Sequence, residues 1–159
     1  MTNWTVSNLE TQGYRLTEEE SRSLRIGLRF PTALCLALVV VGLALQSAPL
    51  ILALVPIGAI AGWSRRHPFD LIWNQALRHL HAAPELPTNP LRRRHAFKLA
   101  TVWLLAVGLL FATGANAFAL GLGLMLVAVC TVVTTTNFCV PSTLLAAWDR
   151  FRRPRQAVT

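Results

Sequence analysis

The chain has 159 residues, of which 53% are hydrophobic and only 14% carry a charged side chain. Soluble domains carry charge on roughly a quarter of their residues, so this composition excludes an ordinary soluble domain. Three cysteines are too few for a disulfide-stabilised secreted scaffold. The length fits one domain, and the composition predicts a small all-α integral membrane protein.

Charged residues are absent from two long stretches, 30–64 and 99–148. A helix needs about 20 apolar residues to cross a hydrocarbon core of roughly 30 Å, so each stretch can hold two spans. Pro49 and the cluster 113–116 are typical of helix breaks. We predict four transmembrane helices, at 30–46, 49–64, 97–113 and 118–139.

The 15 Lys and Arg residues form three blocks, in the N-terminal segment, the middle loop with the start of the third span, and the C-terminal segment. With four spans, these blocks share one side of the membrane. Basic residues next to spans stay on the cytoplasmic side. The charge pattern therefore predicts two hairpins in a bacterial inner membrane, with both termini cytoplasmic. The alternative, one long broken span over 30–64, would place basic blocks on both faces.

The chain divides into five segments on this basis. They are a cytoplasmic N-terminal segment (1–29), a first hairpin (30–64), a cytoplasmic loop (65–96), a second hairpin (97–140) and a basic amphipathic C-terminal segment (141–159). Thr17 and Glu20 have the spacing of a capping box, which predicts an amphipathic helix toward Arg29. This helix either docks a partner or leads into the membrane.

The middle loop has apolar residues at helical spacing from Phe69 to Leu80, after Pro68. This pattern predicts an interfacial amphipathic helix that lies on the membrane. Basic residues at the membrane boundary either anchor the topology or bind anionic head groups or a partner's acidic surface. The residues expected to make lipid or partner contacts are Trp73, Arg92, Arg93, Arg94, Trp148, Arg152 and Arg153.

Nothing in the sequence predicts a metal, a cofactor or a nucleic acid for this chain alone. Its histidines, His67, His79, His81 and His95, all lie in the middle loop, outside the spans. Ionisable residues within spans usually mark ion and proton paths, and none occurs in the charge-free stretches. Basic residues spread over three membrane-adjacent blocks argue against nucleic-acid binding. Pigments, quinone or lipid remain candidates for binding at interfaces with other membrane subunits.

The fourth span is rich in hydroxyl groups, at Thr131, Thr134 and Thr135, and Asn137 follows them. Threonine hydroxyls bond to their own helix or across to a neighbouring helix. The cluster therefore either forms hydrogen bonds between helices or provides a polar face for packing or for a ligand.

Small residues at a spacing of four favour close helix packing. Gly58 and Gly62 form such a pair in the second span, and Ala117 and Gly121 form another in the fourth. Whether these faces pack within the chain or between subunits stays open at this point.

Cys139 is the one cysteine near a membrane boundary, and we consider it a candidate reactive thiol. It belongs to the ending Asn137-Phe138-Cys139-Val140-Pro141-Ser142. With His67-Pro68-Phe69 and the basic start of the third span, this ending resembles a bacterial membrane family, domain of unknown function 4395. The resemblance implies a four-helix membrane protein. Its members commonly end in Phe-Cys-x-x-Cys, and some occur near or fused to thiol-redox domains.

Ser142 occupies the position of the second cysteine in that ending. A dithiol switch needs a resolving thiol. We therefore expect a non-catalytic accessory subunit or assembly factor of a larger inner-membrane complex, photosynthetic or respiratory. The alternatives are a thiol-linked redox protein that uses Cys139 with a partner thiol, and a lipid- or quinone-binding module.

Overall fold

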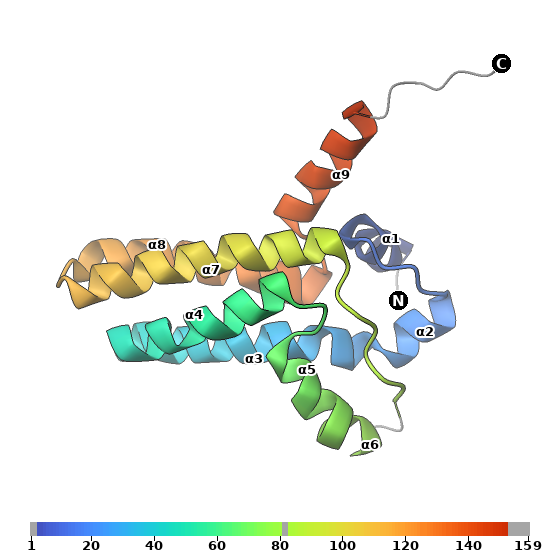
Figure 1. Cartoon of the computed structure of the whole chain (residues 1–159), viewed down its shortest axis with the longest axis horizontal. Helices are drawn as coiled ribbons and strands as arrows, with labels where there is room; N and C mark the ends of the chain where they lie inside the picture. Colours follow the sequence, from blue (N-terminus) through green and yellow to red (C-terminus); the bar gives the residue numbers. More distant parts are fainter. Residues whose placement is uncertain (1–2, 81–82, 153–159) are drawn as a thin grey trace.

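This computed structural model describes residues 3–80 and 83–152, and every regular element in that part of the chain is helical. Four long helices lie side by side as a bundle, and shorter helices gather at one end of it (Figure 1). The helices are α1 (Asn3–Gln12), α2 (Glu18–Ser23), α3 (Arg25–Ala44), α4 (Ala48–Trp63), α5 (Pro68–Ile72), the π-helix η1 (Trp73–Leu77), α6 (Arg78–Leu80), α7 (Leu91–Ala112), α8 (Asn116–Thr136) and α9 (Val140–Arg152).

Three of the bundle helices, α3, α7 and α8, are long and apolar enough to cross a membrane. The fourth, α4, has 16 residues, which reach only about 24 Å. It satisfies the same criterion only together with residues 68–80, from which it is bent by 84°. The all-α prediction is confirmed, with three candidate spans, or four if this bent pair is counted.

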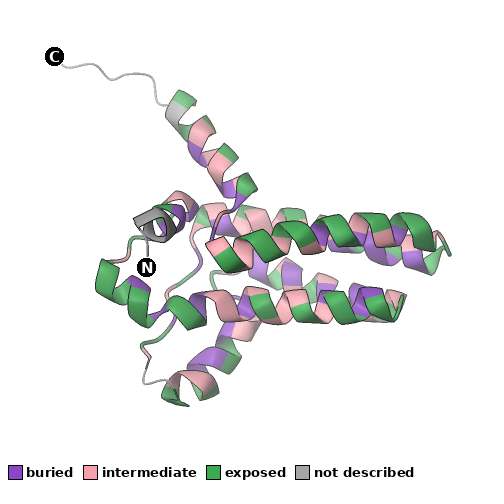
Figure 2. Cartoon of the chain, turned by 180° about the vertical axis from the view of Figure 1, so that it is seen from behind, coloured by how far each residue is buried: buried purple, intermediate pink, exposed green. Residues whose placement is uncertain are grey.

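Two of the helices begin earlier than the apolar pattern predicts. Helix α3 starts at Arg25 and α7 at Leu91, although the charge-free stretches begin at residues 30 and 99. The first turns of both helices lie at the end of the bundle where the short helices gather (Figure 1), and Leu28 and Arg93 in these turns are buried. Figure 2 shows buried and exposed positions alternating along the bundle helices. The hydropathy pattern therefore predicts the apolar part of each helix, and it does not predict the residue at which the helix begins.

Both hairpin turns are short and lie at the opposite end of the bundle (Figure 1). Gln46, with φ 47°, ends the first hairpin's leading helix, and Gly114, with φ 80°, ends that of the second. The side chain of Ser47 then caps α4 by accepting from the Leu50 N–H. The Asn116 amide donates to Gln46 Oε1 at 3.3 Å and so joins the two turns.

Helices α4 and α7 pack closely because two glycines of α4, Gly58 and Gly62, lie at their contact. A Cβ atom on Gly58 would lie 2.6 Å from Thr101 Oγ1, and one on Gly62 would lie 2.7 Å from Lys98 Cγ. This pair of glycines therefore packs within the chain. The second small face is different, because Ala117 and Gly121 are exposed, and a Cβ on Gly121 would meet no described atom within 4 Å.

The middle-loop helix forms as predicted, but part of it faces the other way. Trp73 is 1% exposed and packs with Leu28 and Leu86 in a core at the base of the bundle. Asp70 and Asn74 are buried as well. The exposed large apolar residues of this segment are Leu71, Ile72 and Leu80. The prediction of a lipid contact for Trp73 is therefore wrong.

Polar partners explain this orientation. The His67 N–H donates to Asp70 Oδ2 at 2.7 Å, and the Leu86 N–H donates to Asn74 Oδ1 at 3.0 Å. A buried polar group with a hydrogen-bond partner is tolerated inside a protein. The helical spacing of apolar residues alone did not reveal that Asp70 and Asn74 have hydrogen-bond partners.

Candidate functional site

Arg93, in the first turns of α7, is buried at the basic end of the bundle and is 8% exposed. Its guanidinium donates to Tyr14 Oη at 2.8 Å and to the Leu28 carbonyl at 3.0 Å. A third, longer bond of 3.4 Å reaches Thr32 Oγ1. The rings of Tyr14 and Phe97 lie 5.4 Å and 5.6 Å from the guanidinium carbon. Arg93 thus ties the N-terminal segment, α3 and α7 together.

The hydrogen bonds continue away from Arg93 through the loops. Tyr14 Oη donates to Asn89 Oδ1 at 2.9 Å, and the Asn89 amide donates to Asp70 Oδ2 at 3.4 Å. In the part of the chain that the structure describes, Arg93 forms no ion pair. Asp70, at the far end of this chain of neutral groups, interacts electrostatically with Arg93.

Burial sets the electrostatics of this cluster. Desolvation raises the pKa of Tyr14, and it also raises the pKa of Asp70, although the His67 N–H and Arg93 pull the pKa of Asp70 the other way. Desolvation, with the nearby charge of Arg93, lowers the pKa of His67 to about 4. His67 is therefore neutral at physiological pH. Its Nδ1 accepts from the Phe69 N–H at 3.1 Å, which leaves the proton on Nε2.

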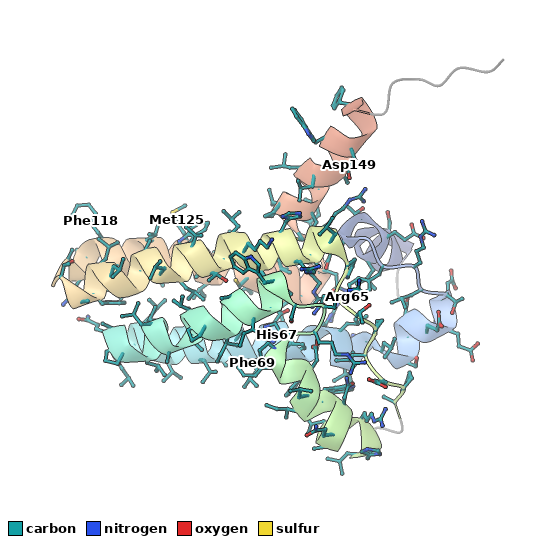
Figure 3. The ribbon with its side chains drawn as sticks, in the orientation of Figure 1. Arg65, His67, Phe69, Phe118, Met125 and Asp149 are labelled. Atoms are coloured by element: carbon teal, nitrogen blue, oxygen red, sulfur yellow. The ribbon has the colours of Figure 1, made fainter. Side chains whose placement is uncertain are left out.

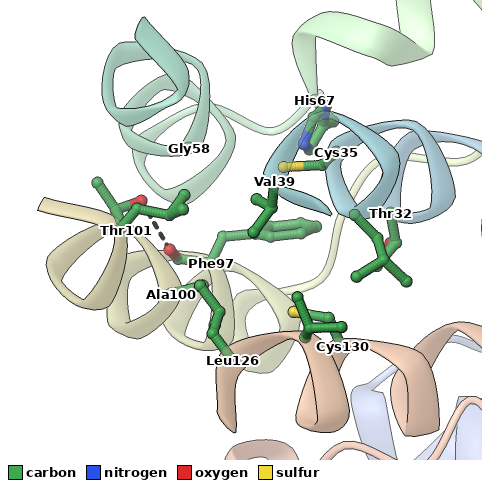
Figure 4. A pocket seen from close by; sticks show the side chains of 13 residues that line it. Thr32, Cys35, Val39, Gly58, His67, Phe97, Ala100, Thr101, Leu126 and Cys130 are labelled. Atoms are coloured by element: carbon green, nitrogen blue, oxygen red, sulfur yellow. Dashed lines mark hydrogen bonds between the residues drawn. The ribbon is translucent and has the colours of Figure 1, made fainter. Parts of the chain in front are cut away.

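His67 also borders a small apolar cavity of about 60 Å³ inside the bundle. Figure 4 shows Cys35 of α3 near His67 and Cys130 of α8 across the cavity. The Thr101 hydroxyl donates to the Phe97 carbonyl at 2.8 Å, so it does not point a free donor into this space. Among the described residues, no group of three or more His, Cys, Asp or Glu side chains is placed to hold a metal ion.

The two arginines beside Arg93 have separate structural roles. Arg92 forms an ion pair with Asp149 of α9 at 2.9 Å and donates to the Thr11 carbonyl at 3.3 Å. Arg94 donates to the carbonyls of Gly62 and Trp63 and so caps the C-terminus of α4. Of the three arginines predicted to contact lipid or a partner, Arg93 is 8% exposed, so most of its side chain contacts protein, and the rest lines the groove beside α9 described below.

The hydroxyls of the fourth span bond to their own helix. Thr131, Thr134 and Thr135 donate to carbonyls four residues earlier, at 2.7 Å each. Within the described residues, these hydroxyls form no hydrogen bond to a neighbouring helix. Asn137 is buried in the left-handed conformation, with φ 56°, and ends α8.

Helix α1 covers this end of α8. Asn8 donates to the Thr136 carbonyl at 3.0 Å, and Gln12 donates to the Asn137 carbonyl at 2.5 Å. A positively charged group, Arg29, also donates to the Thr135 carbonyl at 2.7 Å. These donors satisfy carbonyls that the helix itself leaves without partners. Sequence reasoning missed this role because the bonded residues are more than a hundred positions apart.

Cys139 lies two residues after Asn137 and is buried, with 7% of its surface exposed. Ser142, at the position of the second cysteine in the resembling family, is 0% exposed. The Cys139 carbonyl accepts from the Thr143 N–H at 2.9 Å at the start of α9. As folded, the chain keeps this thiol away from bulk solvent.

Helix α9 leaves the bundle at an angle (Figure 1), and an apolar groove lies between it and the faces of α7 and α8. The volume of this groove is about 570 Å³. Its walls include Trp103, Val129, Cys130, Cys139 and Leu144, and Arg93 and His95 lie at its basic end.

Apolar side chains of α9 are exposed both at the edge of this groove, at Leu144, and beyond it, at Trp148 and Phe151. Leu144, Trp148 and Phe151 are 65%, 55% and 86% exposed, and Asp149 joins the helix to α7 (Figure 3). The side chain of Arg152, all of Arg153 and all of His81 lie outside the described residues. The predicted contacts of these arginines therefore stay predictions.

Comparison with known proteins gives a family. No curated protein and no solved structure matches the chain. The family model described as "Domain of unknown function (DUF4395)" matches residues 25–150, which include every bundle helix and nearly all of α9. The match begins after α1 and α2, so α1, the helix that covers Asn137, precedes it. The chain belongs to the DUF4395 family.

Proposed function

We propose that this protein is a non-catalytic accessory subunit or assembly factor of a larger bacterial inner-membrane complex. The observation that carries the proposal is α9, a helix with exposed apolar side chains that is joined to α7 by an ion pair. Leu144 and Phe151 are 65% and 86% exposed, and the ion pair between Arg92 and Asp149 holds the helix against α7. Large exposed apolar patches on a rigid element are typical of protein–protein or membrane contacts.

The proposed topology has all four bundle helices crossing the membrane. Helix α4 packs against both α3 and α7 within the bundle (Figure 1), which supports its assignment as a short span. The Lys and Arg residues that the structure describes belong to segments at the other end from the two hairpin turns. Through the positive-inside bias, this distribution supports a cytoplasmic location for both termini. Helices α5 to α6, bent by 84° from α4, then lie along the cytoplasmic membrane surface.

The experiment is extraction of the tagged protein from its native membranes in a mild detergent. We would measure the particle mass, the co-purifying proteins and the visible absorption spectrum of one preparation. A multi-subunit or coloured particle of defined composition is expected. A particle that contains this chain alone would contradict the proposal.

A matched pair of variants tests the role of α9. Phe151→Ser removes an apolar group from α9, and Leu80→Ser removes one of similar exposure, 79%, from α6. The proposal expects loss of the co-purifying subunits from the Phe151→Ser preparation alone. Equal retention by both variants would show that α9 does not bind the partner.

A thiol-linked redox function is the second candidate. The observation in its favour is that Cys130 and Cys139 line the same groove. Exchange with a partner's disulfide requires that Cys139, 7% exposed, first becomes accessible, since the attacking thiolate must reach the disulfide sulfur.

A further inference from the structure

We infer that the groove beneath α9 holds one acyl chain of an anionic phospholipid, whose head group lies at the Arg93 end. The groove volume of about 570 Å³ lies within the roughly 300–1,000 Å³ typical of ligand pockets. Its lining is almost wholly apolar and includes Trp103, Val129 and Leu144. This composition suits a hydrocarbon chain.

The dimensions of the groove match one leaflet of a bilayer. Arg93 and Trp103 both line it from α7, and ten residues of helix rise about 15 Å. This length is about half of a hydrocarbon core of roughly 30 Å. The groove therefore begins at the basic end of the bundle and reaches about as deep as the chains of the adjacent leaflet.

Charge complementarity indicates an anionic head group. Arg93 is buried, lines the groove and forms no ion pair in the part of the chain that the structure describes. Its hydrogen bonds go to neutral acceptors, Tyr14, Leu28 and Thr32. The neighbouring His95 also lines the groove and is exposed, so its ring can contact a phosphate at the mouth.

This site differs from the Thr-rich face that the sequence indicated. The hydroxyls of that face are bonded within α8, whereas the groove offers apolar side chains beside a cation. The inference is also independent of the accessory role, because that role is tested at Phe151, which does not line the groove.

Native mass spectrometry of the full-length protein tests the inference. The protein would be placed in nanodiscs of equal parts phosphatidylglycerol and phosphatidylcholine, then released in a mild detergent that retains bound lipid. We expect one retained phosphatidylglycerol, preferred over phosphatidylcholine by about fivefold, the preference that one arginine gives near an anionic head group. Equal retention of the two lipids would overturn the charge assignment.

Groove-filling variants locate the lipid. Val129→Trp fills the groove, and Val102→Trp places the same ring on a lipid-facing position of α7 that is 63% exposed. Retention is expected to fall by about tenfold or more in Val129→Trp and to stay unchanged in Val102→Trp. If Val129→Trp does not fold, Leu99→Trp replaces it, because Leu99 lines the groove yet is 52% exposed.

Two outcomes would overturn the inference. Undiminished retention in a folded groove-filling variant would place the lipid elsewhere. A released species with the mass of a free fatty acid or a quinone would assign the groove to a different ligand class.

Discussion

Arg93 has the charge expected of a membrane anchor, but its guanidinium forms hydrogen bonds inside the protein. Three consecutive arginines in a membrane-adjacent block indicate a lipid-facing cluster, and the sequence offers no reason to separate the middle one. Its partners, Tyr14 and Leu28, lie 79 and 65 positions away. Only the folded chain brings them together, so the sequence predicted the basic end of the bundle but not the buried network within it.

Replacing Arg93 by Met is expected to destabilise the protein by about 2–4 kcal/mol. The change removes the hydrogen bonds to Tyr14 and Leu28 and leaves both acceptors buried. Thermal unfolding in detergent, followed by circular dichroism, measures the effect. Arg22→Met is the control, since its ion pair with Glu18 is exposed and contributes at most a few tenths of a kcal/mol. Equal melting temperatures would contradict the structural role of Arg93.

The depressed pKa of His67 predicts acid lability in a defined window. The unfolded chain protonates His67 near pH 6.5, whereas burial and Arg93 keep the folded form neutral until about pH 4. Because the unfolded state binds the proton first, stability falls as the pH drops from 6.5 to 4, by up to about 3 kcal/mol. The raised pKa of Asp70 offsets part of this loss, because the folded state protonates that carboxyl earlier.

Unfolding midpoints measured across that pH range test the assignment. His67→Gln is expected to flatten the acid-side slope, and His95→Gln, at an exposed position, is expected to keep it. A slope that persists in His67→Gln would assign the pH dependence to other groups.

At the scale of elements, the apolar pattern predicted the bundle and its breaks, because lipid and core both select the same residue types. The apolar pattern could not predict which face of each helix is buried. Gly58 and Gly62 pack against α7, whereas Ala117 and Gly121 point outward, although the two spacings look alike. The middle-loop helix was likewise predicted in place but with the wrong side buried, since Asp70 and Asn74 have partners inside the protein.

The two glycine faces give a matched pair of substitutions. Gly58→Val is expected to destabilise the bundle by about 1–3 kcal/mol, because a Cβ there lies 2.6 Å from Thr101 Oγ1. Gly121→Val is expected to have little effect, as no described atom lies within 4 Å of its Cβ. Thermal unfolding of both variants in one detergent provides the comparison. Loss of stability in Gly121→Val instead would indicate that this face has a partner.

At the scale of the whole molecule, an N-terminal segment outside the DUF4395 match lies against the end of the matched region. Helix α1 supplies Asn8 and Gln12 to the carbonyls that precede Cys139. The predicted capping box at Thr17 and Glu20 is present. The preceding helix and its docking were not predicted, because α1 is short and has no marked apolar face.

Opening this contact is expected to expose the thiol. In a background of Cys35→Ala and Cys130→Ala, Cys139 is the remaining cysteine of the chain. Asn8→Ala combined with Gln12→Ala should raise its alkylation rate by about tenfold, because each change removes a hydrogen bond that holds α1 in place. Glu10→Ala, an exposed α1 position, serves as the control. Equal rates in all three proteins would show that α1 does not shield Cys139.

The two joined hairpin turns have a consequence for how the protein can be labelled from the two sides of the membrane. Gln46 and Asn116 bond to each other, and the turns contain no Lys or Arg. In the proposed topology, trypsin or an amine-reactive label added from the periplasmic side would find no target, while the same reagents in inverted vesicles would find many. Labelling from the two sides of the membrane would therefore report the orientation of the protein directly.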